Sequence, residues 1–293
     1  MRLILAPAAL GVPPTPSGPR PVGEDGGVTN HLTDVEVALA AAEAGARIVR
    51  AAYGTGLTGH AKSGLDFATN ADLDAERAIL EFIRVARPGD ACVGEESGTG
   101  GGPGSRRWLV DPLCGTLNFA AQTPLVAVNV ALVEGPDVLV GVSADPISGE
   151  TFWTDGHGAF VRLDGADVGV SPSARSLLVD VNCDGPAGRP FLGPQLLADP
   201  AFRTMFGPRV LSTTLAVAWV AAGRRAAYVT DGSLVDNVHF AAGIGLSRAA
   251  GCVVSDPAGE ELNAGSGLVV AADRGVHDRL IEIIRPHLMA VRD

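Results

Sequence analysis

Lysine, aromatic residues and closely spaced cysteines are all scarce in this chain of 293 residues. Its four cysteines are far apart and form no Cys-x-x-Cys pair, which argues against a disulfide framework and a structural zinc site. No apolar run reaches the roughly 18 residues of a membrane span. Lys62 is the one lysine and no basic run exists, which argues against nucleic acid as a partner. We therefore expect a protein of a reducing cytoplasm, acting away from membranes.

The composition is that of a folded, acidic protein. Hydrophobic residues make up 46% of the chain, which is enough for a substantial core, and the net charge is -11. Residues 1–30 are rich in proline and glycine and predict an irregular arm. We expect an N-terminal α+β half over residues 31–170 and a C-terminal α/β half over residues 171–293.

The segment from Trp108 to Phe119 predicts a short buried strand, a tight loop and the start of a helix. Backbone N–H groups at such a helix start, here those of Gly115 and Thr116, suit an anion. Cys114 lies inside this loop, where a thiol tends to have a lowered pKa and to be nucleophilic. A small buried and unreactive cysteine is the alternative.

Two further apolar segments, 125–133 and 138–144, predict strands joined by a short turn. If these strands and the strand before Asp111 are neighbours in one sheet, the third strand is parallel to the first. Asp145 then emerges at the same sheet edge as Asp111 and Cys114.

Several motifs occur together in an order typical of one family. They are Gly94-Glu95-Glu96-Ser97, Asp111-Pro112-Leu113-Cys114-Gly115-Thr116, Gly156-His157-Gly158-Ala159-Phe160 and Phe240-Ala241-Ala242-Gly243. Together they resemble the inositol monophosphatase superfamily. The resemblance implies an α/β fold (an α+β layered sandwich) in which layers of helices and sheets alternate. It also makes a homodimer a reasonable expectation.

Two positions depart from the family's pattern. The family has aspartate where this chain has Cys114, and Trp-Asp where it has Val238-His239. In the family, those aspartates and the counterpart of Asp111 would hold a second magnesium ion, which thiolate and imidazole suit poorly. The resemblance leaves Glu95 and Asp111, with the Leu113 carbonyl, as ligands for one residual divalent metal.

The water-activating pair of the family is matched by Asp66 and Thr116. Asp66-Phe67-Ala68-Thr69 is similar to the family's Asp-Leu-Val-Thr segment.

Groups that replace two ligands of one metal should lie near hydrogen-bond distance, so we expect Cys114 and His239 to form a nucleophile–base pair. A carboxylate would orient the imidazole, with Asp145 preferred and Asp111 second. The Gly115 and Thr116 N–H groups would form an oxyanion hole, and no cofactor would be required.

A second resemblance is to stand-alone Dieckmann cyclases of actinobacterial tetramic acid and pyridone antibiotic biosynthesis. It implies the reaction that Cys114 and His239 would catalyse. It implies a cysteine-dependent acyl-transfer cyclase that takes its substrate from an acyl carrier domain. The arginine pairs Arg106-Arg107 and Arg224-Arg225 would supply the docking charge.

Three alternatives stay open at this point. One is an Mg²⁺-dependent phosphomonoesterase acting on a sugar or nucleoside phosphate. Another is a catalytically inactive, phosphatase-like binding protein. The third is a zinc site formed by Cys114, His239 and Asp111, whose side chains are all zinc ligands by type.

Overall fold

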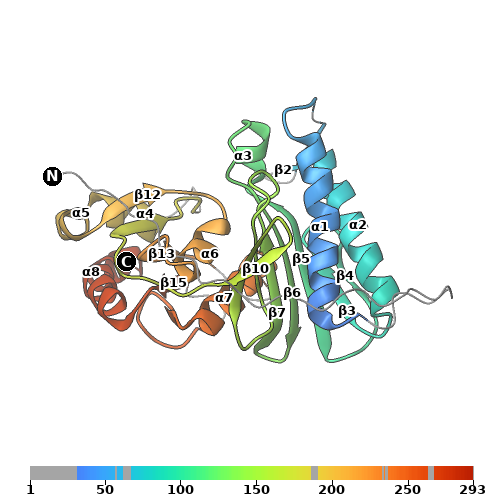
Figure 1. The fold of residues 1–293 in the computed structure, drawn as a ribbon. Helices are drawn as coiled ribbons and strands as arrows, with labels where there is room; N and C mark the ends of the chain where they lie inside the picture. The colour runs from blue at the N-terminus through green and yellow to red at the C-terminus, as the bar shows by residue number, and fades with distance from the viewer. Residues whose placement is uncertain are drawn as a thin grey trace.

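Layers of helices and sheets alternate in the computed structural model (Figure 1). It describes residues 32–56, 58–61, 67–185, 191–232, 234, 237–262 and 267–292. The predicted arm at residues 1–30 and the predicted site residue Asp66 lie outside these ranges. The alternation of helix and sheet layers confirms the predicted fold class.

The first layer consists of two amphipathic helices, α1 (Asp34–Ala52) and α2 (Asn70–Ala86), which cover one face of the larger sheet. Each begins with a capping box, in which a threonine side chain and the carboxylate three residues later satisfy each other's backbone N–H groups. Thr33 and Glu36 form the first box. Thr69 and Asp72 form the second.

The larger sheet has eight strands in the order β10-β9-β8-β7-β6-β5-β3-β4. The bounds are β3 (Ala91–Gly94), β4 (Gly98–Gly101), β5 (Arg106–Cys114), β6 (Ala127–Glu134), β7 (Asp137–Ala144), β8 (Thr151–Thr154), β9 (Ala159–Leu163) and β10 (Ala166–Gly169). Strand β6 is antiparallel to both of its neighbours, so β5 and β7 run parallel, as predicted. A separate hairpin pairs β1 (Gly59–Ala61) with β2 (Phe67–Thr69).

The smaller sheet has five strands in the order β12-β11-β13-β15-β14. These are β11 (Leu178–Val181), β12 (Gly207–Val210), β13 (Ala227–Thr230), β14 (Val253–Ser255) and β15 (Leu268–Ala271). The larger sheet ends at Gly169 and this one begins at Leu178.

A middle layer of two helices, α6 (Leu215–Ala221) and α7 (Ala241–Ala250), separates the sheets and packs against both. The outer face of the smaller sheet is covered by α4 (Leu192–Ala198), α5 (Pro200–Met205) and α8 (Arg274–Arg292). The short helix α3 (Thr116–Ala120) follows β5 at the top of the view in Figure 1. No described helix is both long and apolar enough to cross a lipid bilayer.

Helix α7 lies directly on strand β7 at Gly141. A Cβ atom at Gly141 would come within 2.8 Å of the Ala242 carbonyl oxygen, which is backbone and has little room to move. Glycine therefore sets the distance between the middle helices and the larger sheet, and through it the position of the segment that leads into α7.

We expect Gly141→Ala to lower the free energy of unfolding by about 1–3 kcal/mol, the usual cost of overpacking a core. Denaturant unfolding measures this. The control is Gly169→Ala in exposed strand β10 of the same sheet, where a Cβ would meet nothing within 4 Å. Equal stability of the two variants would show that α7 can move away from β7 at little cost.

Candidate active site

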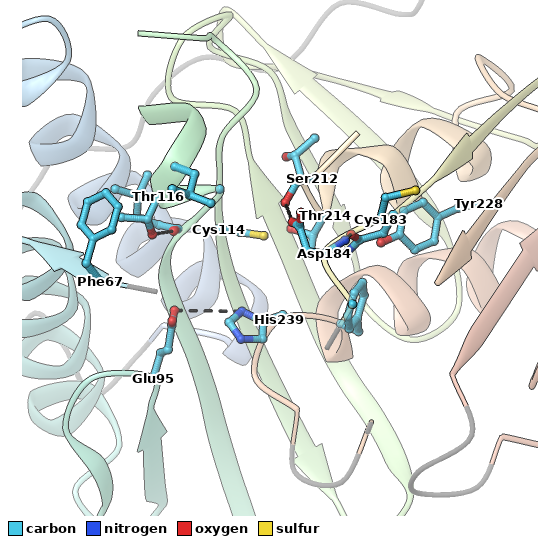
Figure 2. Close-up of a pocket in the computed structure, with 17 residues that line it drawn as sticks. Phe67, Glu95, Cys114, Thr116, Cys183, Asp184, Ser212, Thr214, Tyr228 and His239 are labelled. Atoms are coloured by element: carbon cyan, nitrogen blue, oxygen red, sulfur yellow. Dashed lines mark hydrogen bonds and ion pairs between the residues drawn. The ribbon is translucent and has the colours of Figure 1, made fainter. Parts of the chain in front are cut away.

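A cavity of about 800 Å³ opens where the end of β5 faces the segment leading into α7 and the smaller sheet (Figure 2). Its lining includes Glu95, Cys114, Thr116, Thr214, Tyr228 and His239. Strands β3 and β5 run parallel, so Glu95 after β3 and the carboxyl end of β5 reach the same edge. The sheet therefore gathers the predicted site residues from distant parts of the sequence.

Asp111 is the buried centre of this site. Its carboxylate is inaccessible to solvent and accepts hydrogen bonds from His239 Nδ1 at 2.7 Å, Leu113 N at 3.1 Å and Asn129 Nδ2 at 3.2 Å. Burial opposes ionisation, but the neighbouring His239 ring and the hydrogen bonds outweigh it and hold the pKa of Asp111 below its usual value. Asp111 is therefore a buried carboxylate held in its charged form.

His239 is held in place through hydrogen bonds to both its backbone and its ring. Its backbone N–H donates to Asn237 Oδ1 at 2.9 Å, just before α7. Its Nδ1 atom contacts Asp111 and lies 4.0 Å from Glu95 Oε2, while 37% of the side chain stays exposed on the cavity side. The histidine thus bridges the buried carboxylate and the open space.

Cys114 lies beside this pair. One ligand atom from each of Asp111, Cys114 and His239 lies within 4.8 Å of the other two. Burial and the charge of Asp111 raise the pKa of the Cys114 thiol well above its usual value, although Thr214 hydrogen-bonds the sulfur. The expectation of a lowered thiol pKa is therefore wrong, because burial and a nearby carboxylate dominate.

The structure places Asp145 elsewhere. Its Oδ1 atom accepts the N–H groups of Ile147 at 2.8 Å and Ser148 at 3.0 Å, so the side chain closes the turn that follows β7. Strand β6 lies between this turn and β5. The preferred choice of Asp145 as the partner of His239 is corrected to Asp111.

Thr116 forms the second polar pair of the cavity, with a partner that the sequence reading did not choose. Its hydroxyl lies 3.1 Å from Asp72 Oδ1 and 3.2 Å from the Leu113 carbonyl oxygen. Asp72 is buried, and burial raises the pKa of its carboxyl group despite hydrogen bonds from Thr69 and Thr116. The Thr-x-x-Asp capping pattern at Thr69 was the signal that could have identified it.

Glu76 of α2 is a further residue that the sequence reading missed. Its buried carboxylate accepts the N–H groups of Glu96 at 2.8 Å and Ser97 at 2.9 Å. A Cβ atom at Gly94 would lie 2.6 Å from the Glu76 carboxyl carbon, so only glycine allows this approach. Glu76 therefore holds the turn that carries Glu95.

The side chains present suit one magnesium ion better than two. Glu95, Asp111 and the Leu113 carbonyl supply the hard oxygen ligands that magnesium prefers. Cys114 and His239 supply sulfur and nitrogen, which do not suit a second magnesium ion.

Comparison with known proteins gives the same assignment of fold and adds an activity class. The chain matches the Inositol monophosphatase family over residues 30–289. It is 33% identical to inositol-1-monophosphatase of Caulobacter vibrioides, over 76% of this chain and 89% of that protein. It is 32% identical to fructose-1,6-bisphosphatase/inositol-1-monophosphatase of Thermotoga maritima, over 75% of this chain and 82% of that protein.

Solved structures of similar proteins show the same fold. The extragenic suppressor protein suhB of Bartonella henselae superposes with a TM-score of 0.77 at 29% identity, covering 85% of this chain and 97% of that one. The chain therefore belongs to the inositol monophosphatase family.

The expected cysteine-dependent Dieckmann cyclase is overturned by these comparisons, because relatives that match most of this chain carry phosphatase names. An acyl carrier domain was expected only as the substrate donor of that cyclase, so it is not proposed as a partner of this protein. The proposed docking arginines are engaged instead: Arg106 with Asp34, Arg224 with Glu150 and Arg225 with Asp180.

Replacing Glu76 with glutamine should loosen the turn that carries Glu95. One of the two N–H donors then faces an amide NH₂, so we expect a loss of about 1–3 kcal/mol in unfolding free energy. Divalent-metal affinity, measured by titration calorimetry, should fall about 10- to 100-fold, as for the loss of an outer-shell partner. Glu81→Gln, on an exposed position of the same helix, is the control. Equal unfolding free energies and equal metal affinities of the two variants would rule out this role for Glu76.

Proposed function

We propose that this protein is a phosphomonoesterase that hydrolyses a small phosphorylated polyol or sugar. Membership of the inositol monophosphatase family and the names of its relatives support the reaction class. The observation that carries the proposal is the hydrogen-bonded chain from Asp72 through the Thr116 hydroxyl at the cavity wall.

The phosphate group would bind at the turn between β5 and α3. Gly115 has a left-handed backbone with φ of 95°, and a Cβ there would meet the Leu125 carbonyl at 2.8 Å. This conformation lets the backbone of Gly115 and Thr116 line the cavity, where their N–H groups can donate to phosphate oxygens. The predicted oxyanion site thus becomes the phosphate site.

Across the cavity lie polar groups that suit the hydroxyls of a polyol. Asn182, Asp184 and Ser212 line that side, and the Ser212 hydroxyl donates to the Asp184 carboxylate. Carboxylate, amide and hydroxyl groups together can donate to and accept from neighbouring substrate hydroxyls.

Asp72 and Thr116 would orient the attacking water. The Thr116 hydroxyl accepts a proton from water while it donates to Asp72, so the buried carboxylate acts as the base behind the hydroxyl. A magnesium ion held by Glu95, Asp111 and the Leu113 carbonyl would supply Lewis-acid stabilisation of phosphate charge.

Phosphate release tests this function directly. The full-length chain is incubated with inositol 1-phosphate, fructose 1,6-bisphosphate and a nucleoside monophosphate, with Mg²⁺, Mn²⁺ or Zn²⁺ supplied in turn. We expect metal-dependent release of inorganic phosphate from a polyol or sugar phosphate, abolished by chelator. No release under any of these conditions would reject the proposal and favour the non-catalytic alternative.

Replacing Asp72 with asparagine should lower kcat by about 100-fold or more, which is the contribution of a positioned general base. KM should change little, because Asp72 is behind Thr116 and does not contact the phosphate. Asp74→Asn is the matched control, because Asp74 is exposed on the same helix and pairs with the exposed Arg77. If both variants retain full activity, Asp72 has no part in catalysis.

A further inference from the structure

Three different ligand types meet at the end of β5: the carboxylate of Asp111, the thiol of Cys114 and the imidazole of His239. Their ligand atoms lie within 4.8 Å of one another, and among the described residues this is the one such group of three. In Figure 2 the Cys114 sulfur and the His239 ring project into the same space in front of the strand.

The backbone holds these side chains in place. The pairing of β5 with β6 shifts register between Asp111 and Cys114, which turns both side chains to one side of the strand end. Asn129 and the Leu113 amide fix the carboxylate, and the Asn237 side chain fixes the backbone of His239. These outer contacts are of the kind that orient ligands in metal sites.

The ligand types decide which ion such a site would select. Zinc takes sulfur, nitrogen and oxygen ligands in tetrahedral geometry, and three protein ligands with one open position are typical of catalytic zinc. Magnesium requires octahedral oxygen coordination and discriminates against thiolate and imidazole. With a thiolate, a carboxylate and a neutral imidazole, a bound Zn²⁺ ion also leaves the site without net charge.

We propose that Asp111, Cys114 and His239 bind a zinc ion, with the fourth coordination position open toward the cavity. On binding, the Cys114 thiol forms a sulfur–zinc bond and releases its proton to solvent, while His239 coordinates as the neutral ring. The 2.7 Å hydrogen bond between His239 and Asp111 gives way to coordination of both groups. Glu95 Oε2, 4.0 Å from the His239 ring nitrogen, lies beside the site.

The role of this ion in turnover rests on the proposed phosphatase function, whereas its binding does not. The open position faces the space where phosphate would lie, so zinc would polarise a phosphate oxygen in place of the second magnesium ion. The chain would then combine one oxygen-ligand site and one mixed-ligand site that share Asp111.

The test is metal binding by the full-length chain, purified without a polyhistidine tag and stripped with chelator. Zn²⁺ and its spectroscopic substitute Co²⁺ are titrated in the presence of excess Mg²⁺. We expect one equivalent of Zn²⁺ that Mg²⁺ does not displace. Co²⁺ should give a thiolate-to-metal charge-transfer band and the intense visible absorption of tetrahedral coordination.

Two substitutions and one control locate the site. Cys114→Ser should remove the charge-transfer band and weaken zinc binding at least about 100-fold, because losing only an outer-shell partner costs about 10- to 100-fold. Cys114→Asp should restore an oxygen ligand and shift selectivity from Zn²⁺ toward Mg²⁺. Cys183→Ser is the control, because Cys183 also lines the cavity but is not one of the three ligands. Circular dichroism confirms that each variant folds.

The outcomes separate this proposal from the proposed function. An unchanged Co²⁺ spectrum and zinc affinity in Cys114→Ser, or no zinc binding by the native chain, would overturn the zinc site. Phosphate release with Mg²⁺ alone would still stand in that case. Conversely, Cys114-dependent zinc binding without phosphate release from any substrate would support the site and reject the phosphatase.

Discussion

The buried charge of Asp111 is the constraint on which the arrangement of this molecule depends. A carboxylate removed from water is strongly unfavourable unless it is paired and hydrogen-bonded. Each partner of Asp111 comes from a different element: the Leu113 amide from its own strand, Asn129 from β6, and His239 from the segment before α7. Asn129 also donates to Thr214, at the start of α6. Satisfying one charge thus ties the larger sheet to the middle helices.

The outer helix α2 fixes the opposite wall of the cavity in a similar way. Asp72 in its first turn accepts the Thr116 hydroxyl, and Glu76 one turn later accepts two amides of the turn after Glu95. Both carboxylates are buried and both point from the helix toward the ends of β3 and β5. Residues of the cavity wall therefore depend on a helix that lies behind the sheet, and its placement by the capping box at Thr69 is part of the site's construction.

Local patterns predicted much of the fold, whereas side-chain direction limited the prediction of the site. The parallel course of β5 and β7 follows from a short-range rule on neighbouring strands, and the structure confirms it; the capping box at Thr33 likewise follows the local Thr-x-x-Glu pattern. Asp145 does emerge at the expected edge, but its carboxylate is taken by the next turn of its own chain. Sequence periodicity carries no information on that competition. Likewise, a loop cysteine suggested a reactive thiol, but burial beside a charged carboxylate raises its pKa.

The change at Cys114 and His239 is best understood through the charge of the whole cluster. Carboxylates at both positions would add two negative charges beside Asp111 and Glu95, and a second dication would balance them. A thiol and an imidazole add no negative charge, so the cluster can be balanced without a second magnesium ion, and the His239 ring already hydrogen-bonds Asp111. A cation that enters must therefore displace the thiol proton of Cys114 and the hydrogen bond between His239 and Asp111, and recover that cost through stronger bonds. Magnesium forms weak bonds to sulfur and nitrogen, whereas zinc forms strong ones. The cysteine and histidine that remove the need for a second magnesium ion therefore also restrict which metal can bind in its place.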